Sequence, residues 1–113
     1  MKEKQELLIY IKWILDSINI IYEYTYWQDN LEFLWDSKTI DAVTIQFLHI
    51  WETARKLEKY YSNNEDIKKL PLWSMIWFRN FIAHEYLGVS WNKIWESIKY
   101  DLPELKKILE KIK

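Results

Sequence analysis

Apolar residues recur every three or four positions over two long stretches of the chain, which is the spacing of one buried face on an α-helix. The first stretch covers residues 2–27 and the second covers residues 38–61. In the first, the recurring side chains are Leu7, Leu8, Ile11, Ile14, Leu15, Ile18, Ile21 and Tyr22. In the second, they are Ala42, Val43, Ile45, Phe47, Leu48, Ile50, Trp51, Ala54 and Leu57. We therefore predict two long helices, each with a broad buried side.

Shorter elements are predicted between these helices and directly after them. Residues 29–35 have the pattern of a short helical piece before a turn at Asp36-Ser37. Residues 62–66 (Ser-Asn-Asn-Glu-Asp) form a polar break. The segment that follows, up to Leu70, is predicted to be a loop or a single helical turn.

The last third of the chain is predicted to hold further helices. Proline is tolerated at the first position of a helix, so Pro71 is expected to open one that runs to about Tyr86, with Gly88 placed to end it. Ser90 is placed to cap the next helix, over about 91–100. Asp101-Leu102-Pro103 is expected to break that helix and start the last one.

Composition supports an all-helical fold. A β-rich domain of 113 residues needs many turn residues, whereas this chain has one glycine and two prolines. The length suits one domain, and half of the residues are hydrophobic, which is enough for a packed core. We predict an all-α, up-and-down bundle of four main helices plus short helices, forming a single helical domain over residues 1–113.

Charge and cysteine content narrow the classes of function. The chain has no cysteine, which excludes disulfides and thiolate metal sites, and its two histidines lack a metal-binding spacing. No apolar run approaches the roughly 20 residues of a membrane span, so a soluble cytoplasmic protein is expected. The net charge is −1, so any contact with RNA must come from a local basic patch.

The segment from Trp77 to Tyr86 gathers polar groups on one side of a predicted helix. At about 100° per residue, His84 lies about 140° from Arg79, Asn80 about 100° and Tyr86 about 20°. Asn80 and His84 are four residues apart and can touch, whereas Arg79 and His84 cannot stack. Those two can meet one ligand through the reach of arginine, a distorted helix end, or a second subunit.

Arginine and histidine together suit cleavage of RNA by its own 2′-hydroxyl. The imidazole of His84 titrates near neutral pH and can act as a general base or acid, and Arg79 can stabilise charge on the phosphorus. This route needs no metal and no cofactor. A purely structural role is the competing interpretation, because a histidine near a helix C-terminus also interacts favourably with the helix dipole.

The motif Arg79-Asn80-x-x-x-His84-x-Tyr86 resembles the signature of the HepT-like branch of HEPN proteins. The similarity extends to Pro71-Leu72-Trp73, Gly88-Val89, Ile94-Trp95 and 101–105 (Asp-Leu-Pro-Glu-Leu), and upstream to 33–36, 41–43 and 50–54. It covers about residues 5–110. Trp51 departs from the pattern, because the family usually has a small residue there.

The resemblance implies a function and partners. HepT-like proteins are helical homodimers in which the Arg–His motifs of two subunits face a shared cleft, and they act as metal-independent endoribonuclease toxins. A minimal nucleotidyltransferase antitoxin transfers AMP from ATP onto the motif tyrosine, here Tyr86. The expected catalytic pair is Arg79 and His84, supported by Asn80 and Glu52, with transfer RNA or messenger RNA as substrate.

The sequence also allows a second function and other roles for single residues. The chain could instead be a non-catalytic subunit that presents substrate or nucleotide to a nucleotidyltransferase. Glu52 could be a partner for Arg79 or a charge at a subunit interface, and Arg55 is expected on a solvated helix face. His49, within an apolar helix, is expected in the core. Several of the eight tryptophans are expected at a subunit interface.

Overall fold

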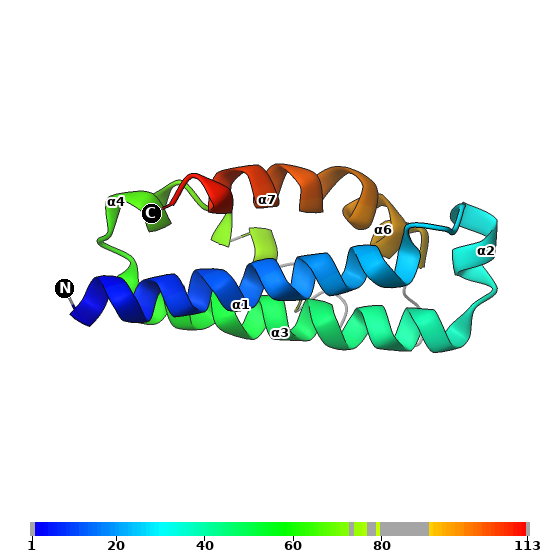
Figure 1. Cartoon of the computed structure of the whole chain (residues 1–113), viewed down its shortest axis with the longest axis horizontal. Helices are drawn as coiled ribbons and strands as arrows, with labels where there is room; N and C mark the ends of the chain where they lie inside the picture. The colour runs from blue at the N-terminus through cyan, green and yellow to red at the C-terminus, as the bar shows by residue number, and fades with distance from the viewer. Residues whose placement is uncertain (1, 73, 77–78, 80–90, 113) are drawn as a thin grey trace.

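The computed structural model describes residues 2–72, 74–76, 79 and 91–112. Two long helices, α1 (Lys2–Thr25) and α3 (Ser37–Tyr61), lie side by side along the molecule. A second layer, formed by α6 (Trp91–Glu96) and α7 (Leu102–Glu110), lies against this pair (Figure 1). The short helices α2 (Asn30–Leu34) and α4 (Glu65–Lys68) lie at opposite ends of the molecule. The all-α prediction is confirmed, since the described part of the chain contains helices and no strand.

Side-chain hydrogen bonds to backbone N–H groups explain where the short helices α2 and α4 begin. The Asp29 carboxylate accepts a bond from the Glu32 N–H at 2.8 Å, and the Asp29 N–H donates back to Glu32 Oε1 at 3.0 Å. This reciprocal pair is a capping box and starts α2. Asn64 similarly caps α4 by accepting from the N–H groups of Asp66 and Ile67. The predicted helical piece at 29–35 is thus confirmed, and the single turn before Leu70 proves to be α4.

The core lies between the α1–α3 pair and the C-terminal helices. Its fully buried side chains follow helical spacing on each element, as the sequence pattern predicts. They include Ile14, Ile18 and Ile21 on α1, Val43, Ile50, Ala54 and Leu57 on α3, and Ile94 and Leu109 on α6 and α7. Phe33 of α2 is also fully buried, with its ring centroid 5.2 Å from that of Trp95, so α2 closes one end of the core.

The predicted start of the last helix at residues 101–103 is confirmed, because α7 begins at Leu102, but the predicted break before it is wrong. Helical backbone continues from α6 through a π-helical segment, η1 (Ser97–Asp101), directly into α7. The Leu102 N–H bonds the Ser97 carbonyl, and the Ser97 hydroxyl donates to Asp101 Oδ2 at 2.9 Å. Proline lacks an N–H and its ring crowds the carbonyl four residues back, and the wider π turn accommodates Pro103 without ending the helix.

The helix predicted to open at Pro71 falls mostly outside the described residues. Backbone is helical at residue 72, at 74–76 and at 79. The expected end of this helix near Tyr86 and Gly88, and the expected cap at Ser90, lie outside the described residues.

The Asp36 side chain connects the start of α3 to the loop between α1 and α2 through hydrogen bonds. Its carboxylate accepts bonds from the Thr39 hydroxyl at 2.6 Å, the Thr39 N–H at 3.1 Å and the Gln28 amide at 2.8 Å. The bond from the Thr39 hydroxyl is the main reason why the pKa of Asp36 lies below its usual value, and the Thr39 N–H, Gln28 and the charge of Lys38 lower it further. Folding therefore favours the ionised carboxylate.

Replacing Asp36 with alanine is expected to lower the melting temperature at pH 7. Because the folded pKa is depressed, the carboxylate contributes fully above its unfolded pKa of about 3.9, and the contribution is lost as pH falls through the lower folded pKa. Thermal denaturation followed by circular dichroism between pH 7 and pH 2 should show the gap to wild type closing below about pH 4. Asp41→Ala, an exposed position on the same helix, is the control. A gap that stays constant down to pH 2 contradicts the prediction.

Candidate functional site

Arg79 faces helix α3 and meets a carboxylate there. Its Nη2 atom lies 3.5 Å from Oε1 of Glu52, and the Arg79 side chain is 30% exposed. A charge-assisted hydrogen bond is typically about 2.7–2.9 Å long, so this is a looser ion pair. The two residues are far apart in sequence, and the packing of the Arg79 segment on α3 brings them together. The interpretation of Glu52 as a partner for Arg79 therefore agrees with this geometry.

Glu52 also contacts the second arginine of the chain. Arg55 Nη1 lies 3.9 Å from the same Glu52 oxygen, and both side chains are about half exposed. Arg55 thus lies on a solvated helix face, as predicted. Two guanidinium groups thus contact one carboxylate, and guanidinium groups are well suited to binding a phosphodiester.

A cavity of about 620 Å³ opens beside Glu52 and Arg55. Glu52, Arg55 and Lys56 line it from α3, and Ile76, three residues before Arg79, lines it from the other side. Tyr10, Glu58, Lys59 and Tyr60 complete the lining. The sequence prediction did not include Lys56, Lys59 or the two tyrosines. The recurrence of charged residues at 52, 55, 56 and 59 on one side of a helix was the signal that could have identified this wall.

The other residues of the predicted site are Asn80, His84 and Tyr86, and they lie outside the described residues. Among the predicted site residues, the described part of the chain therefore contains Arg79 and Glu52, which it brings into contact.

His49 is not a core residue, contrary to the prediction. Its neighbours Leu48 and Ile50 are half-buried and buried, but His49 is exposed on α3. A rotation of about 100° per residue carries adjacent positions to different faces, and this face of α3 is not covered by another described helix. His49 lines a separate cavity of about 440 Å³ between α1 and α3, together with Trp13 and Glu52.

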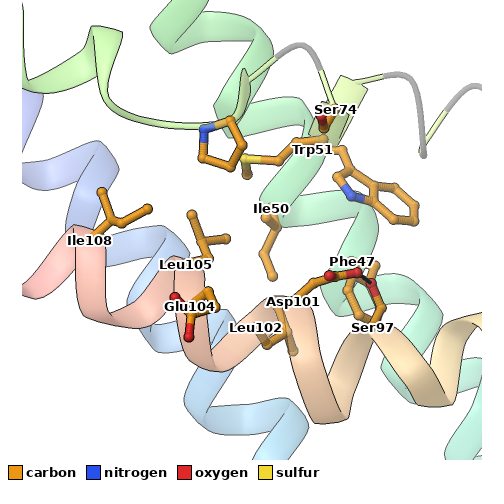
Figure 2. Close-up of a pocket in the computed structure, with 12 residues that line it drawn as sticks. Phe47, Ile50, Trp51, Ser74, Ser97, Asp101, Leu102, Glu104, Leu105 and Ile108 are labelled. Atoms are coloured by element: carbon orange, nitrogen blue, oxygen red, sulfur yellow. Dashed lines mark hydrogen bonds between the residues drawn. The ribbon is translucent and has the colours of Figure 1, made fainter.

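A third cavity lies inside the bundle and is chiefly apolar. Figure 2 shows Phe47, Ile50 and Trp51 of α3 on one side and Leu102, Leu105 and Ile108 of α7 on the other. Its volume is about 440 Å³, and the hydrogen-bonded Ser97–Asp101 pair lies at its edge. Trp51, the departure from the family pattern, is buried and stacks on Phe47 with ring centroids 5.3 Å apart. The bulky Trp51 side chain is thus packed in the core.

The tryptophans divide between core and surface. Trp51 and Trp95 are buried, whereas Trp13, Trp27 and Trp35 are exposed. Trp73 and Trp77 lie outside the described residues. The expected place of several tryptophans at a subunit interface stays a prediction.

Two properties of the described residues concern metal binding and membrane insertion. No three His, Cys, Asp or Glu side chains gather in a metal-binding arrangement within residues 2–72, 74–76, 79 and 91–112. Over the same residues, no helix is both long enough and apolar enough to cross a membrane.

Comparison with known proteins points to RNA chemistry. The family described as "Ribonuclease HepT-like" matches residues 14–112. The chain is 31% identical over 110 residues to "Putative RNase MJ0125" of Methanocaldococcus jannaschii, covering 96% of this chain and 92% of that protein. It is 29% identical over 104 residues to "Probable ribonuclease HepT" of Thermococcus cleftensis, covering 92% and 93%. No solved structure gives a significant match.

Proposed function

Because this chain belongs to the HepT-like ribonuclease family, we propose that it is a metal-independent endoribonuclease in which Arg79 and His84 act on the scissile phosphate. Members of the family are ribonucleases, so the substrate is RNA. The observation that carries the proposal is the Arg79–Glu52 ion pair at the edge of a cavity lined by further cations. It places the Arg79 guanidinium against Glu52, which lines this cavity.

The proposed reaction uses the RNA 2′-hydroxyl as nucleophile. His84 accepts the 2′-hydroxyl proton, the oxygen forms a bond to phosphorus, and the bond from phosphorus to the 5′-oxygen breaks. The departing 5′-oxygen takes a proton, from His84 of the same or a second subunit or from water. The products are a 2′,3′-cyclic phosphate and a 5′-hydroxyl. Arg79 stabilises the additional negative charge on the phosphorane-like transition state.

Glu52 and Asn80 are proposed as supporting residues. The ion pair with Glu52 restricts the Arg79 side chain to fewer rotamers before substrate binds. Less conformational entropy is then lost when Arg79 contacts the phosphate. At 3.5 Å, the pair is loose enough for a phosphate oxygen to compete for the guanidinium N–H groups. Asn80 is four residues before His84, which is the spacing at which its amide can hydrogen-bond the imidazole.

The family resemblance supports a proposal about control. A nucleotidyltransferase antitoxin transfers AMP from ATP to Tyr86, whose oxygen attacks the α-phosphorus while pyrophosphate leaves and the phenol proton passes to solvent. In the helix that the sequence predicts, Tyr86 is seven residues from Arg79, two turns along the same side. A phosphate on Tyr86 therefore competes with RNA for Arg79. In this proposal the protein is the toxin of a toxin–antitoxin pair and acts as a homodimer.

The net charge of −1 favours one alternative. A non-catalytic subunit that presents substrate or nucleotide to a nucleotidyltransferase needs no bulk attraction for RNA. Such a subunit binds nucleotide or its partner protein and leaves RNA intact, so a cleavage assay separates the two functions.

The deciding experiment is cleavage of labelled transfer RNA by the wild-type protein in excess chelator. We expect cleavage that is insensitive to chelator and leaves 2′,3′-cyclic phosphate ends, because the proposed route needs no metal. Protein carrying Arg79→Ala, purified in the same way, controls for contaminating nucleases. Mass spectrometry of the wild type establishes that Tyr86 is unmodified in the assay. Intact RNA with unmodified Tyr86 would move the assignment to the non-catalytic subunit.

A further inference from the structure

Helices α1 and α3 present two matching stripes of side chains to one groove. On α1 the stripe is Trp13, Asp16, Ser17 and Ile20, and on α3 it is Gln46, His49, Glu52, Thr53 and Lys56. Both follow the three-and-four spacing of one helix face. Between them lies the cavity of about 440 Å³, which is within the usual size range of small-molecule sites.

This groove borders the candidate active site, because the two cavities share lining residues. Glu52 and Lys56 line both the groove and the cavity beside Arg55. Glu52 also contacts Arg79 directly, at 3.5 Å. A strand whose phosphate is held at Arg79 therefore has the groove as its next binding surface.

The charge around the groove favours a polyanion, although the whole chain is slightly acidic. Each carboxylate that lines it is compensated: Asp16 pairs with Lys12 at 2.7 Å, and Glu52 pairs with Arg79 and Arg55. In the described part of the chain, no carboxylate oxygen lies within 4 Å of the Lys56 ammonium group. The lining residues and their ion-pair partners thus contain more cations than anions.

Trp13 supplies a flat apolar surface beside these charges. Its side chain is 49% exposed, yet the ring packs edge-on against Tyr10 with centroids 5.3 Å apart. The indole is therefore held in position while one part of it faces solvent. An aromatic ring next to cations is the combination on which bases of single-stranded nucleic acid stack.

Two polar side chains are placed to contact a base edge. Within the described residues, neither the Gln46 amide nor the His49 imidazole makes a side-chain hydrogen bond. The Thr53 hydroxyl, in contrast, is engaged with the His49 carbonyl at 2.8 Å. Gln46 and His49 each offer a donor and an acceptor, which is what recognition of a base edge requires.

We propose that this groove is a nucleobase subsite for single-stranded RNA next to the scissile phosphate. Trp13 stacks on the base, Gln46 and His49 contact its edge, and Lys56 binds an adjoining phosphate. The proposal rests on the proposed ribonuclease function and adds a determinant of base preference. The mixed, compensated polar lining favours RNA over a second protein surface, for which an apolar centre is typical.

The test compares Trp13→Ala with Trp27→Ala, a control of equal chemistry that is 56% exposed near the end of the loop after α1. Binding of a short single-stranded RNA made uncleavable by 2′-O-methyl groups is measured by fluorescence anisotropy. Loss of one stacked base weakens binding by about 5- to 150-fold. We expect that loss for Trp13→Ala and wild-type affinity for Trp27→Ala. In the cleavage assay, Trp13→Ala raises KM and leaves kcat near wild type.

Base preference provides a readout that altered folding cannot mimic. Uncleavable oligonucleotides of A, C, G and U are compared on wild type, Gln46→Ala and His49→Ala, and we expect their order of affinity to change in the two variants. Unchanged affinity in Trp13→Ala, or an unchanged order in both polar variants, overturns the proposal. So does a change of oligomeric state in Trp13→Ala by light scattering, which would assign the groove to a subunit interface. If wild type binds RNA through Trp13 but does not cleave it, the subsite is supported and the nuclease function is rejected. If RNA is cleaved and the cleavage does not depend on Trp13, the nuclease function is supported and the subsite is rejected.

Discussion

Replacing Arg79 with alanine is expected to reduce the rate of RNA cleavage by about 100- to 1000-fold, the typical effect of removing one preorganised donor to a transition-state oxyanion. The guanidinium is proposed to act on the charge that develops at phosphorus, so the loss should appear in kcat as well as in kcat/KM. Arg79 is partly exposed and pairs with an exposed carboxylate, and such pairs contribute little to folding. The melting temperature should therefore remain near that of wild type.

Two further variants distinguish the positive charge of Arg79 from the shape and position of its guanidinium group. Arg79→Lys keeps the charge but removes the planar fork of donors, so we expect it to recover only a small part of the lost rate. Arg55→Ala removes the other arginine contacting Glu52, and its effect should be much smaller and confined to KM. Single-turnover cleavage of labelled RNA measures these rates. An Arg79→Ala protein that cleaves at the wild-type rate would remove Arg79 from the mechanism.

Replacing His84 with alanine is expected to lower kcat by about 100- to 10,000-fold, the usual contribution of a positioned general acid or base. His84→Gln keeps hydrogen-bonding capacity but cannot titrate, so it should be as inactive as the alanine variant. The wild-type rate should change with pH near the ordinary histidine pKa of about 6.5, and this dependence should disappear from the residual activity of both variants.

The second histidine of the chain offers an internal comparison. His49 lines the groove next to Glu52, so His49→Ala is expected to act on KM and base preference, whereas His84 variants act on kcat. Steady-state kinetics at several pH values distinguish the two patterns. If His84→Gln retains wild-type kcat and its pH dependence, another group must transfer the proton.

The helical elements could be predicted from the sequence because their determinants are local. The buried stripe of α1 and the caps at Asp29 and Asp36 depend on residues within one or two turns of each other. The shortage of glycine and proline also argued against a β-rich fold, because these residues act locally by forming the turns between strands. These features hold whatever the helices later pack against, so bounds for α1 and α3 came within a few residues of those observed.

The candidate site was only partly predictable. The motif identified Arg79, His84, Asn80 and Tyr86 through their spacing and their resemblance to a family. The role of Glu52 stayed open, because a contact between residues 27 positions apart depends on how two helices pack. The Arg79–Glu52 distance of 3.5 Å comes from that packing alone.

By itself, the sequence determined the helical class, most helix starts and ends, and the family, whereas the roles of the motif residues stay predictions. Only the tertiary structure decided that His49 faces solvent and that a π-helical segment precedes Pro103. It also decided that Trp13 and Lys56 line a groove together with Glu52, the residue that contacts Arg79. The physical reason is range. Helix capping and periodicity are properties of neighbouring residues, whereas exposure of a helix face depends on which other helices cover it, and a groove exists only between packed elements.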